Sequence, residues 1–406
     1  MKIIHSSDWH LGRSLYNRKR YDEFDAFLNH LAEYIEENAV DALIVAGDIF
    51  DTGTPSNRAQ QLYYRFLNRV SASSCQHVVI TAGNHDSPTF LNAPKEILKA
   101  LDVSVIGAIS DELEDEILVL KNSDGEDSLI VCAVPYLRDR DIRSAEAGET
   151  SEDKERKLIL GIKEHYQKVC ELAQEKQTKL GKKIPILATG HLFAAGGKAQ
   201  EGDGVRDLYV GNLGQVTQES FPECIDYLAL GHLHVPQKLG SNETRRYSGS
   251  PLPMSFGEAK QQKIFIEVEF DQNELTVKEI NLPCFQKLVQ VRGDWPTIEE
   301  QINKLKEDEQ STWIEVIYQG DEIISDLQNK LTKLTEKSHL EILRIQNKRL
   351  IERALKRMHS DETLDQLSES EVFKRCLTEQ NVTTEQQDEL NLCFSEILHD
   401  LHEEND

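Results

Sequence analysis

The sequence predicts an α/β fold, and three features of its N-terminal part support this prediction. Apolar runs of strand length occur at residues 2–8, 41–48 and 77–84. The segments between them, 21–38 and 57–70, carry apolar side chains at three- and four-residue spacing, which is typical of amphipathic helices. The strand at 41–48 is apolar almost throughout, as expected when both faces of a sheet are covered. The order strand, helix, strand, helix, strand indicates a layered α/β protein.

The chain continues with further buried strands. Apolar segments predict these strands at residues 128–135, 184–191, 226–234 and 263–270. Residues 150–180 have a polar helical pattern, which we expect to be too charged to belong to a core. The Gly-rich segment 193–207 predicts a mobile surface loop.

The length of 406 residues predicts two or three domains. After residue 275 the pattern changes to a short series of strand, helix, strand, helix, strand, which indicates a small separate α/β unit. We therefore expect three regions, 1–275, 276–347 and 348–406. The last is predicted to be a basic linker followed by helices that open with N-cap signals.

The composition excludes several classes of protein. With 39% hydrophobic and 29% charged residues, the chain is expected to be globular. No apolar run approaches the ~20 residues of a membrane helix, and the N-terminal segment lacks the apolar core of a secretory signal. We therefore expect a cytoplasmic protein without a membrane partner. The seven cysteines include no CxxC pair, which indicates reduced thiols.

The charge of the chain is uneven. A net charge of -25 argues against nonspecific coating of nucleic acid, because phosphate binding needs local positive charge. Residues 361–406 contain fourteen acidic and two basic side chains, whereas residues 1–20 contain five basic side chains and one acidic side chain. The average charge is therefore compatible with a local basic surface near the N-terminus.

Polar side chains that can bind metal ions follow five of the predicted strands. They are Asp8 and His10, Asp48, Asn84 and His85, His191, and finally His232 and His234. In open α/β sheets, sites form beyond the carboxyl ends of the strands. A capping aspartate or a surface histidine would explain any one of these positions, but structural needs give no reason to repeat them at five strand ends. The combination predicts a metal site.

The types of side chain limit the metal. Imidazole with carboxylate and amide oxygen, and without thiolate, suits Mn, Fe or Zn better than Ca or a zinc-thiolate centre. Seven ligands are too many for one ion and fit two ions that share a carboxylate. Two ions about 3.5–4 Å apart can hold both the attacking and the leaving oxygen of a phosphoryl displacement.

The order of the motifs D-x-H, GD, GNHD, GH and GHxH resembles the calcineurin-like metallophosphoesterases. Within them the chain resembles the SbcD family of bacterial nuclease subunits in the segments SDWHLGR, DALIVAGDIFDTGTPS, AGNHDS, VPYLRDRDI, ATGHL, VRDLYVG, LALGHLH and YSGSPLPMSFGE. The resemblance covers about residues 1–270 and continues less specifically beyond them. It implies a layered β-sandwich flanked by helices (a metallophosphoesterase nuclease domain), a small α/β capping domain and a C-terminal helical tail.

The resemblance also implies roles for single residues. One ion would be held by Asp8, His10, Asp48 and His234, and the other by Asp48, Asn84, His191 and His232, so that Asp48 bridges them. The implied cofactor is two Mn²⁺ ions, with Mg²⁺, Fe and Zn as alternatives. The implied catalytic residues are His85, which would stabilise or protonate the leaving oxygen, and Asp86, which would orient nearby groups. Asp51 is expected to support these loops, and His5 is expected to be structural.

DNA is the substrate that the resemblance implies. Candidate contacts are Arg13, Arg18, Lys19 and Arg20 near the first ligand loop, and Arg138, Arg140, Arg143 and Arg206 on loops that should border the site. Solvated surface charge explains any single one of them equally well. Contacts to phosphates are independent of sequence, which suits an enzyme that cuts DNA ends of any sequence.

Two protein partners are implied as well. The segments 57–70 and 89–101 carry more apolar residues than one helix face needs, and the family suggests a homodimer through them, although core packing is an alternative. The spacing of the apolar residues between 364 and 401 predicts two amphipathic helices. The family suggests that they bind the SbcC ATPase within a heterotetramer; a hairpin folded back on the nuclease is the alternative.

Three hypotheses for the function follow. The first is a metal-dependent DNA nuclease, exonuclease on duplex and endonuclease on single strands and hairpins, in an ATPase-driven complex of DNA end processing, recombination and repair. The second is a calcineurin-like phosphatase or phosphodiesterase that acts on another phosphoester, for which we would expect a more compact chain. The third is a noncatalytic scaffold, for which we would expect lost ligands.

Overall fold

The computed structural model describes residues 1–144, 146, 148–194, 216–271, 274–320, 324 and 326–347, and six single residues after them. The chain divides into two compact units. The first consists of Met1–Val289 with Ser311–Trp313, and the second consists of Gln290–Gln310 with Ile314–Asp406. Apart from residues 193 and 194 and those six single residues, the predicted Gly-rich loop and the predicted tail of 348–406 lie outside the described residues.

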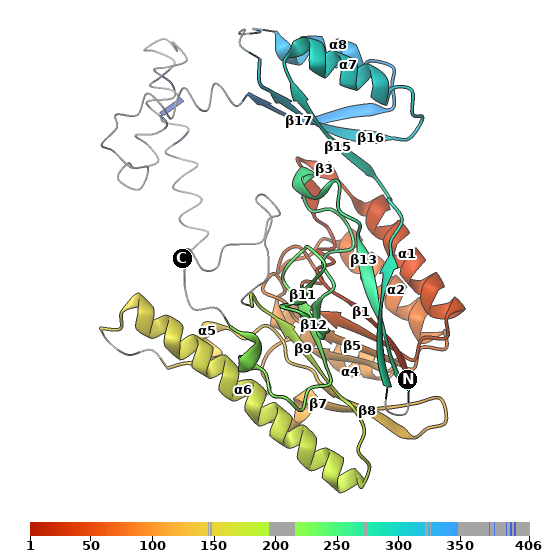
Figure 1. The fold of residues 1–406 in the computed structure, drawn as a ribbon, viewed down its shortest axis with the longest axis vertical. Coiled ribbons are helices and arrows are strands. Elements are labelled where there is room, and N and C mark those ends of the chain that lie inside the picture. Colours follow the sequence, from red (N-terminus) through yellow and green to blue (C-terminus); the bar gives the residue numbers. More distant parts are fainter. Residues whose placement is uncertain are drawn as a thin grey trace. The chain divides into compact units, whose positions relative to one another are not determined.

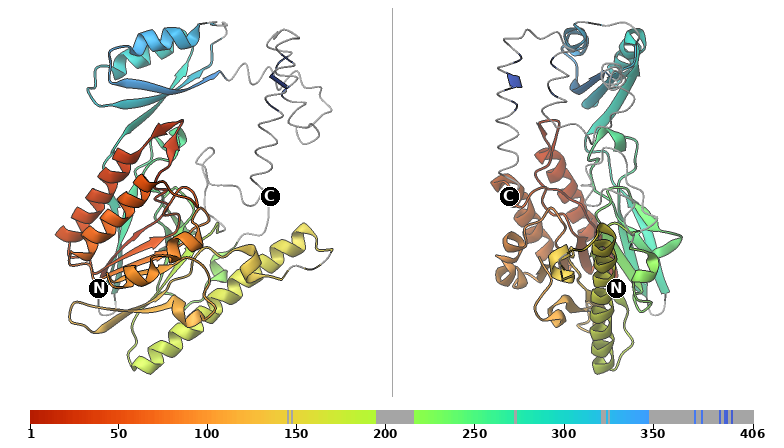
Figure 2. Two further views of the ribbon diagram at one scale, coloured as in Figure 1. Left: turned by 180° about the vertical axis from the view of Figure 1, so that it is seen from behind. Right: turned by 90° about the vertical axis from the view of Figure 1, so that its left-hand side faces the viewer.

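The first unit contains two stacked six-stranded sheets. The first sheet has the order β14-β13-β1-β4-β5-β6, with the bounds Glu274–Asn281, Ile264–Asp271, Lys2–Ser6, Ala42–Ala46, His77–Thr81 and Val103–Ile106. Strands β1, β4, β5 and β6 are parallel, whereas β13 and β14 form an antiparallel hairpin beside β1. Helices α1 (Tyr21–Glu37) and α2 (Asn57–Ser71) connect the parallel strands and lie side by side (Figures 1 and 2). The predicted strand and helix order of this part is confirmed.

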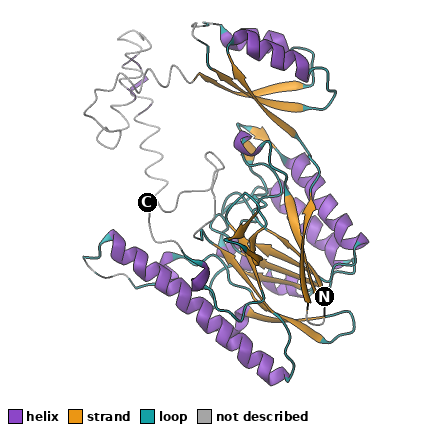
Figure 3. Ribbon diagram, in the orientation of Figure 1, coloured by secondary structure: helices purple, strands orange, loops and turns teal. Residues whose placement is uncertain are grey.

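The second sheet has the order β11-β12-β10-β9-β8-β7, with the bounds Gln237–Leu239, Asn242–Tyr247, Tyr227–Gly231, Ile186–His191, Asp127–Cys132 and Ile117–Lys121. Helix α6 (Ser151–Leu180) packs against its outer face. Figure 3 shows the strands of this unit gathered between the helices. Between the sheets lies a separate apolar layer, which includes Ile3, Ile44 and Val79 from one sheet and Val131, Leu187 and Ala229 from the other. The predicted layered β-sandwich flanked by helices is confirmed.

Helix α6 corrects the expectation that residues 150–180 are too charged for a core. Thr150 and Asp153 form a capping box at its start, and Gly181 ends it in the left-handed conformation. One face of the helix is buried against the second sheet and includes Leu158, Ile162, Tyr166, Val169, Cys170 and Ala173. The charged residues occupy the other face, so α6 is amphipathic.

Short elements complete the first unit. They are β2 (Ser14–Leu15), β3 (Arg18–Lys19), α3 (Pro88–Asn92), α4 (Lys95–Lys99), α5 (Asp139–Ile142) and the 3₁₀ turns η1 (Leu113–Glu116), η2 (Gln218–Ser220) and η3 (Phe256–Glu258). The predicted helical segment 89–101 is two short helices, because Pro94 stands at the N-terminus of α4 and separates it from α3.

The second unit contains two helices and most of a three-stranded sheet, whose strands β15 and β16 begin with residues of the first unit. Its elements are β15 (Lys287–Gly293), α7 (Trp295–Leu305), β16 (Thr312–Tyr318), α8 (Leu327–Thr335) and β17 (Leu340–Asn347), and the sheet order is β15-β16-β17. Ile298, Ile302, Leu327 and Leu331 are buried on its helices. The first unit extends to Val289, later than the expected boundary at residue 275, because β14 pairs with β13 along its whole length up to Asn281.

Two further observations concern the whole described chain. None of its described helices combines the length and the apolar character needed to cross a bilayer. Five cysteines among the described residues are free thiols, namely Cys75, Cys132, Cys170, Cys224 and Cys284.

His5 has a structural place in the fold, as expected. It lies on β1, is fully buried between the two sheets, and its Nδ1 is 3.0 Å from the hydroxyl of Tyr227 on β10. Burial lowers the pKa of His5 to about 3. The folded protein therefore holds this imidazole neutral, whereas the unfolded chain would protonate it at mildly acidic pH.

This difference predicts a pH dependence of stability. Between the folded pKa of about 3 and the unfolded value of 6.5, the unfolded state binds more protons, so stability falls as the pH falls. Between about pH 7.5 and about pH 5.5 we expect the wild type to lose about 1.4 kcal/mol more than the non-titrating variant His5→Gln. Urea unfolding of both proteins, in chelator to remove metals, measures this; equal losses would contradict the assignment.

Candidate metal centre

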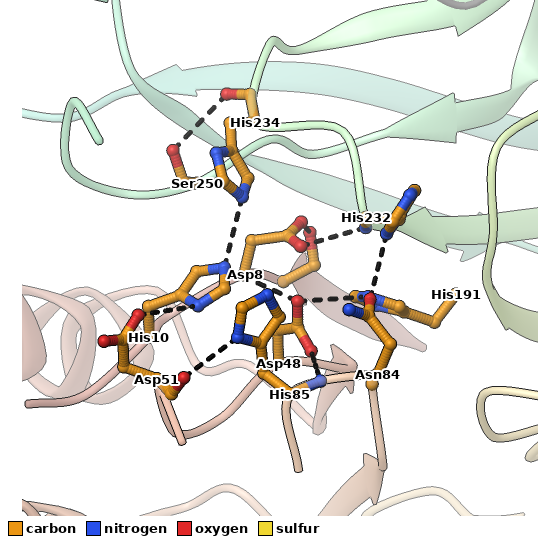
Figure 4. Close-up of polar contacts among 12 residues, drawn as sticks. Asp8, His10, Asp48, Asp51, Asn84, His85, His191, His232, His234 and Ser250 are labelled. Carbon is orange, nitrogen blue, oxygen red and sulfur yellow. Dashed lines mark hydrogen bonds and ion pairs between the residues drawn. The ribbon is translucent and has the colours of Figure 1, made fainter. Parts of the chain in front are cut away.

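The structure brings all seven predicted ligands to one rim of the sandwich (Figure 4). From the first sheet, Asp8 and His10 follow β1, Asp48 follows β4, and Asn84 follows β5. From the second sheet, His191 ends β9, and His232 and His234 follow β10. Both sheets direct the carboxyl ends of these strands to the same place, and for that reason side chains far apart in sequence meet.

His191 faces two oxygen atoms with its Nε2. Its Nδ1 is 3.0 Å from the carbonyl oxygen of Ala46, so Nδ1 must carry a proton and donate it. Its Nε2 is 3.2 Å from Asp48 Oδ2 and 3.1 Å from Asn84 Oδ1. Nε2 and the two oxygens are lone-pair atoms once Nε2 is unprotonated, so a positive charge belongs between them, either the Nε2 proton or a bound cation.

A second group of lone-pair atoms lies around His10 and His234, whose Nε2 atoms are 3.1 Å apart. The Nδ1 of His10 is 3.5 Å from Asp51 Oδ1, and its Nε2 is 3.5 Å from Asp48 Oδ2. Asp8 belongs to the same cluster, because its carboxylate oxygen, a nitrogen of His10 and a nitrogen of His234 lie within 4.8 Å of one another. The same Asp48 oxygen thus contacts an imidazole of each group, as expected for a bridging carboxylate.

His232 completes the cluster from the second sheet. Its backbone N–H donates to Asp8 Oδ1 at 2.9 Å, and its Nδ1 is 3.0 Å from Asn84 Oδ1. Asp8 also accepts a hydrogen bond from the hydroxyl of Ser7. The chemistry of the donors (imidazole, carboxylate and amide oxygen) therefore fits two adjacent divalent cations, the sites that the ligand motifs predict.

Four of the candidate ligands have left-handed backbone. Their φ angles are 54° at Asp8, 46° at His10, 51° at Asp48 and 97° at His232. For residues other than glycine this conformation is disfavoured, at a cost of about 1–3 kcal/mol each in the least populated regions. Such strain gathers at functional sites, because the loops turn sharply there to direct side chains inward.

Glycines before the ligands allow the loops to approach. A Cβ on Gly47 would lie 2.1 Å from His191 Nδ1, and one on Gly83 would lie 2.1 Å from Asp48 Oδ1. A Cβ on Gly231 would lie 1.9 Å from the carbonyl oxygen of Ala46. The G in GD, in GNHD and in the second GH motif is therefore needed for packing at the centre.

The electrostatics of the centre favour a positive charge. Although burial opposes ionisation of Asp48, the adjacent His191 and His10 hold the pKa of Asp48 well below its usual value. Burial disfavours charge on His191 too, but Asp48 raises the pKa of His191 to about 9. Burial lowers the pKa of His10 and His234, and lowers that of His232 to about 3. These three imidazoles stay neutral and can offer lone pairs to a metal.

Asp86 supports the loops and does not face the centre. Its carboxylate accepts hydrogen bonds from the backbone N–H groups of Ile49 (3.1 Å), Phe50 (3.0 Å) and Gly83 (2.9 Å). The assignment of Asp86 as a catalytic residue is corrected accordingly: it is a positioning residue that ties the Asp48 loop to the loop after β5. Its expected role in orienting nearby groups agrees with these contacts.

Asp51 and His85 lie beside the centre. The carbonyl oxygen of Asp51 is 2.9 Å from His85 Nδ1, and the backbone N–H of His85 donates to Asp48 Oδ1 at 2.9 Å. The ring of His85 meets that of His10 edge-on, with 4.8 Å between centroids. His85 is partly exposed, so its other nitrogen, Nε2, is the ring atom left for a substrate.

The prediction that Arg20 contacts DNA is wrong. Its side chain is buried, and its guanidinium donates to both carboxylate oxygens of Glu23, at 3.0 and 2.6 Å, and to the carbonyl oxygen of Pro253 at 2.6 Å. The sequence could not show this, because a neighbouring acidic residue is equally compatible with an exposed arginine.

The other basic candidates differ in their accessibility. Arg18, Lys19 and Arg140 are exposed, and Arg13 pairs with Asp51 Oδ1 at 3.3 Å next to the centre. Arg138 is 3.5 Å from the carbonyl oxygen of Asp86. Arg143 binds the carboxylates of Asp139 and Glu149, which disfavours a phosphate contact. Arg206 lies outside the described residues.

Sequence reasoning missed two features at the rim. Tyr16 is 38% exposed in the turn between β2 and β3 and stacks on Phe256, with 5.8 Å between ring centroids. The sequence feature that could have pointed to Tyr16 is the presence of an aromatic residue within the basic segment LYNRKR. The buried pair Glu258 and Lys263 lies next to His234. Glu258 ends the motif YSGSPLPMSFGE, but Lys263 lies outside every motif, and isolated charged residues are usually exposed.

A buried group of Asp, Asn and His side chains at the edge of two stacked sheets defines a metal-dependent phosphoesterase, and comparisons with known proteins agree. The family model of calcineurin-like phosphoesterases matches residues 1–236, and a model described as Type 5 capsule protein repressor C-terminal domain matches residues 284–381. The SbcD subunit of the nuclease SbcCD from Escherichia coli (strain K12) is 36% identical over 413 residues, which cover 100% of both chains.

Two SbcD proteins from other bacteria are similar as well. The protein of Bacillus subtilis (strain 168) is 34% identical over 292 residues, 71% of each chain, and that of Rhodobacter capsulatus is 35% identical over 264 residues, 64% of each chain. The chain therefore belongs to the calcineurin-like phosphoesterase family and, within it, to the SbcD family of nuclease subunits.

The packing of the glycines gives a prediction for metal binding. In Gly83→Ala the new methyl group would collide with the carboxylate and the backbone nitrogen of Asp48, the shared ligand. We expect a loss of Mn²⁺ affinity of about tenfold or more, measured by titration of chelator-treated protein. Gly53→Ala is the matched control, because its Cβ would meet Ser87 Cβ at an ordinary 3.5 Å. Equal affinities of the two variants would contradict this account.

Proposed function

We propose that this chain is the nuclease subunit of an SbcCD-type complex and hydrolyses phosphodiester bonds of DNA, as a duplex exonuclease and as an endonuclease on single strands and hairpins. The observation that carries the proposal is the position of Asp48 between two groups of lone-pair atoms, with Oδ2 at 3.5 Å from His10 and 3.2 Å from His191. The end-to-end similarity to an SbcD nuclease supports the substrate class. DNA end processing, recombination and repair follow as the processes it serves.

Two divalent cations are proposed as cofactors, with Mn²⁺ favoured over Mg²⁺, Fe and Zn. Asp8, His10, Asp48 and His234 would hold one cation, and Asp48, Asn84, His191 and His232 would hold the other. When bound, such a pair lowers the pKa of water and offsets the charge that develops on the phosphoryl oxygens. The donor set supports this choice, because it combines neutral imidazoles with oxygen ligands.

His85 is proposed as the residue that serves the leaving oxygen. Since its Nδ1 is 2.9 Å from the Asp51 carbonyl oxygen, Nδ1 keeps its proton, and Nε2 is the atom that exchanges protons with a substrate. Its backbone N–H holds Asp48 Oδ1 at 2.9 Å, which fixes its place next to the shared ligand. The imidazolium form can donate from Nε2 to the departing oxygen of the cut strand.

DNA is proposed to lie across the rim beside the β2–β3 turn. Arg18 and Lys19 are exposed there, and Arg13 lies between the turn and the centre. Arg138 and Arg140 are proposed to contact phosphates on the other side. The chain has a net charge of -25, so these local cations, rather than the average charge, must attract the phosphates.

The proposed assembly contains an SbcC ATPase and a second copy of this chain within a heterotetramer. Its support is the similarity to an SbcD protein over the whole chain, and the match of residues 284–381 to a C-terminal domain model. We propose a nuclease domain that extends beyond the expected boundary at residue 275 to Val289, a capping domain from there to residue 347, and 348–406 as the segment that binds SbcC. A cytoplasmic location is proposed for this complex.

The alternative of a phosphatase or phosphodiesterase acting on another phosphoester is not favoured. The relatives that match the chain at 34–36% identity are named nucleases. The scaffold hypothesis is disfavoured as well, because each of the seven candidate ligands is present and directed to the rim.

The first prediction for this function concerns His85. With Mn²⁺ the purified protein should degrade linear duplex DNA, and His85→Ala should reduce the rate by about 10²–10⁴-fold, the usual contribution of a general acid. The metal content should stay near two ions per chain, because His85 is not a proposed ligand. Gel assays of DNA cleavage and elemental analysis measure the two quantities. Cleavage of small phosphomonoesters alone would contradict the nuclease proposal.

The second prediction concerns the tail. Deletion of residues 360–406 should leave Mn²⁺-dependent cleavage within about twofold of the intact chain, because each proposed ligand lies before residue 235. The same deletion should prevent recovery of the chain with the SbcC ATPase in affinity purification. Copurification of the truncated chain would contradict the docking role of the tail.

A further inference from the structure

A buried ion pair lies next to the centre and has no part in the chemistry proposed above. Lys263 is 5% exposed and Glu258 is fully buried, and the ammonium of Lys263 donates to the carboxylate of Glu258. Burying two charges is costly, and removal of one partner alone is strongly destabilising. Because the burial of this pair is costly, we examine which neighbouring groups its charges fix in place.

Besides Glu258 and Gln261, the ammonium of Lys263 contacts the loop of His234. Its Nζ donates to the carbonyl oxygen of His234 at 3.0 Å and to Ser250 Oγ at 3.1 Å. The same carbonyl accepts the backbone N–H of Ser250 at 3.1 Å and the hydroxyl of Ser250 at 3.4 Å, the second of which Figure 4 shows. The backbone of His234 is thus anchored by an ammonium and by an amide, which leaves its side chain little freedom to move.

Glu258 acts on the imidazole of His234. Its Oε1 is 4.0 Å from Nδ1, on the side of the ring away from His10. At 4.0 Å the two groups are not hydrogen-bonded, but the negative charge of the carboxylate beside Nδ1 favours a proton there and a lone pair on Nε2. Nε2 is the atom that meets His10 Nε2 at 3.1 Å, so the carboxylate presents the lone pair to the proposed cation site.

The pair also joins the two sheets. His234 follows β10 of the second sheet, whereas Lys263 immediately precedes β13 of the first. Strand β13 pairs with β1, the strand that leads to His10. The bond from Lys263 to His234 therefore ties the ligand loop of one sheet to the sheet that carries the opposite ligand, and sets the gap between the two imidazoles.

We propose that Lys263 and Glu258 are positioning residues that hold His234 against His10, so that the cation shared by these two histidines binds tightly. The proposal rests on the ligand assignment of the proposed function. Because His234 belongs to one of the two proposed cation sites, loss of the pair should weaken one ion and spare the other.

The test is a titration of chelator-treated protein with Mn²⁺. The double variant Glu258→Leu/Lys263→Met removes both charges and avoids an unpaired one. We expect one ion to bind as in the wild type and the other to bind about tenfold or more weakly. Electron paramagnetic resonance should then show isolated Mn²⁺ at concentrations where the wild type gives the signal of a coupled pair.

A matched control separates positioning from general damage. Glu116 and His165 form another buried pair, 2.9 Å apart, between η1 and α6. Glu116→Leu/His165→Met should bind both ions as the wild type does. If Glu258→Leu/Lys263→Met fails to fold, Ser250→Ala takes its place; it keeps the charges, and we expect about threefold weaker binding of the same ion.

The outcomes are distinguishable. If the double variant, or Ser250→Ala when it is used, binds both ions with wild-type affinity, the positioning role is overturned. In that case, loss of one ion in His10→Ala would show that the ligand assignment still holds. Retention of both ions by His10→Ala overturns the ligand assignment, and the inference fails with it.

Discussion

The carboxylate of Asp48 is the constraint on which the rest of the structure depends. One of its oxygens lies within 3.5 Å of imidazoles from both sheets, and the other accepts the backbone N–H of His85. A buried carboxylate can hold this place only if positive charge is near it, because an isolated ion in the interior is costly. The loops of the two stacked sheets place imidazoles around this one side chain, and the proposed cations would supply the positive charge.

The surrounding loops are strained, and specific contacts offset that strain. Asp8, His10, Asp48 and His232 have left-handed backbone, and glycines before the ligands let the chain pass within van der Waals contact. Asp86 ties two of the loops together through three backbone N–H groups, and Lys263 anchors a third through the carbonyl of His234. Rigid support of this kind keeps ligands in place before a metal arrives.

Two arginines of one basic segment have different roles because one is exposed and the other is buried. Arg18 and Arg20 are two positions apart in one basic segment, yet Arg18 is exposed and Arg20 is buried with Glu23. The same local sequence therefore supplies one arginine at the surface and another that forms an internal link to Pro253. The role of a charged side chain depends on the tertiary structure, because ion pairing and exposure to solvent determine the free energy of keeping it charged.

The sequence by itself determined the alternation of strands and helices up to residue 84, the strand and helix order of the second unit, and the seven candidate ligands, because hydrophobic periodicity and strand ends are local properties. It missed the buried face of α6, the extension of the first unit through β14, and the supporting roles of Glu258 and Lys263. Only the tertiary structure decided these, because each depends on which distant segment supplies a partner. His234 shows the difference: its motif predicts a ligand, but the lysine that holds it stands twenty-nine residues later on the other sheet.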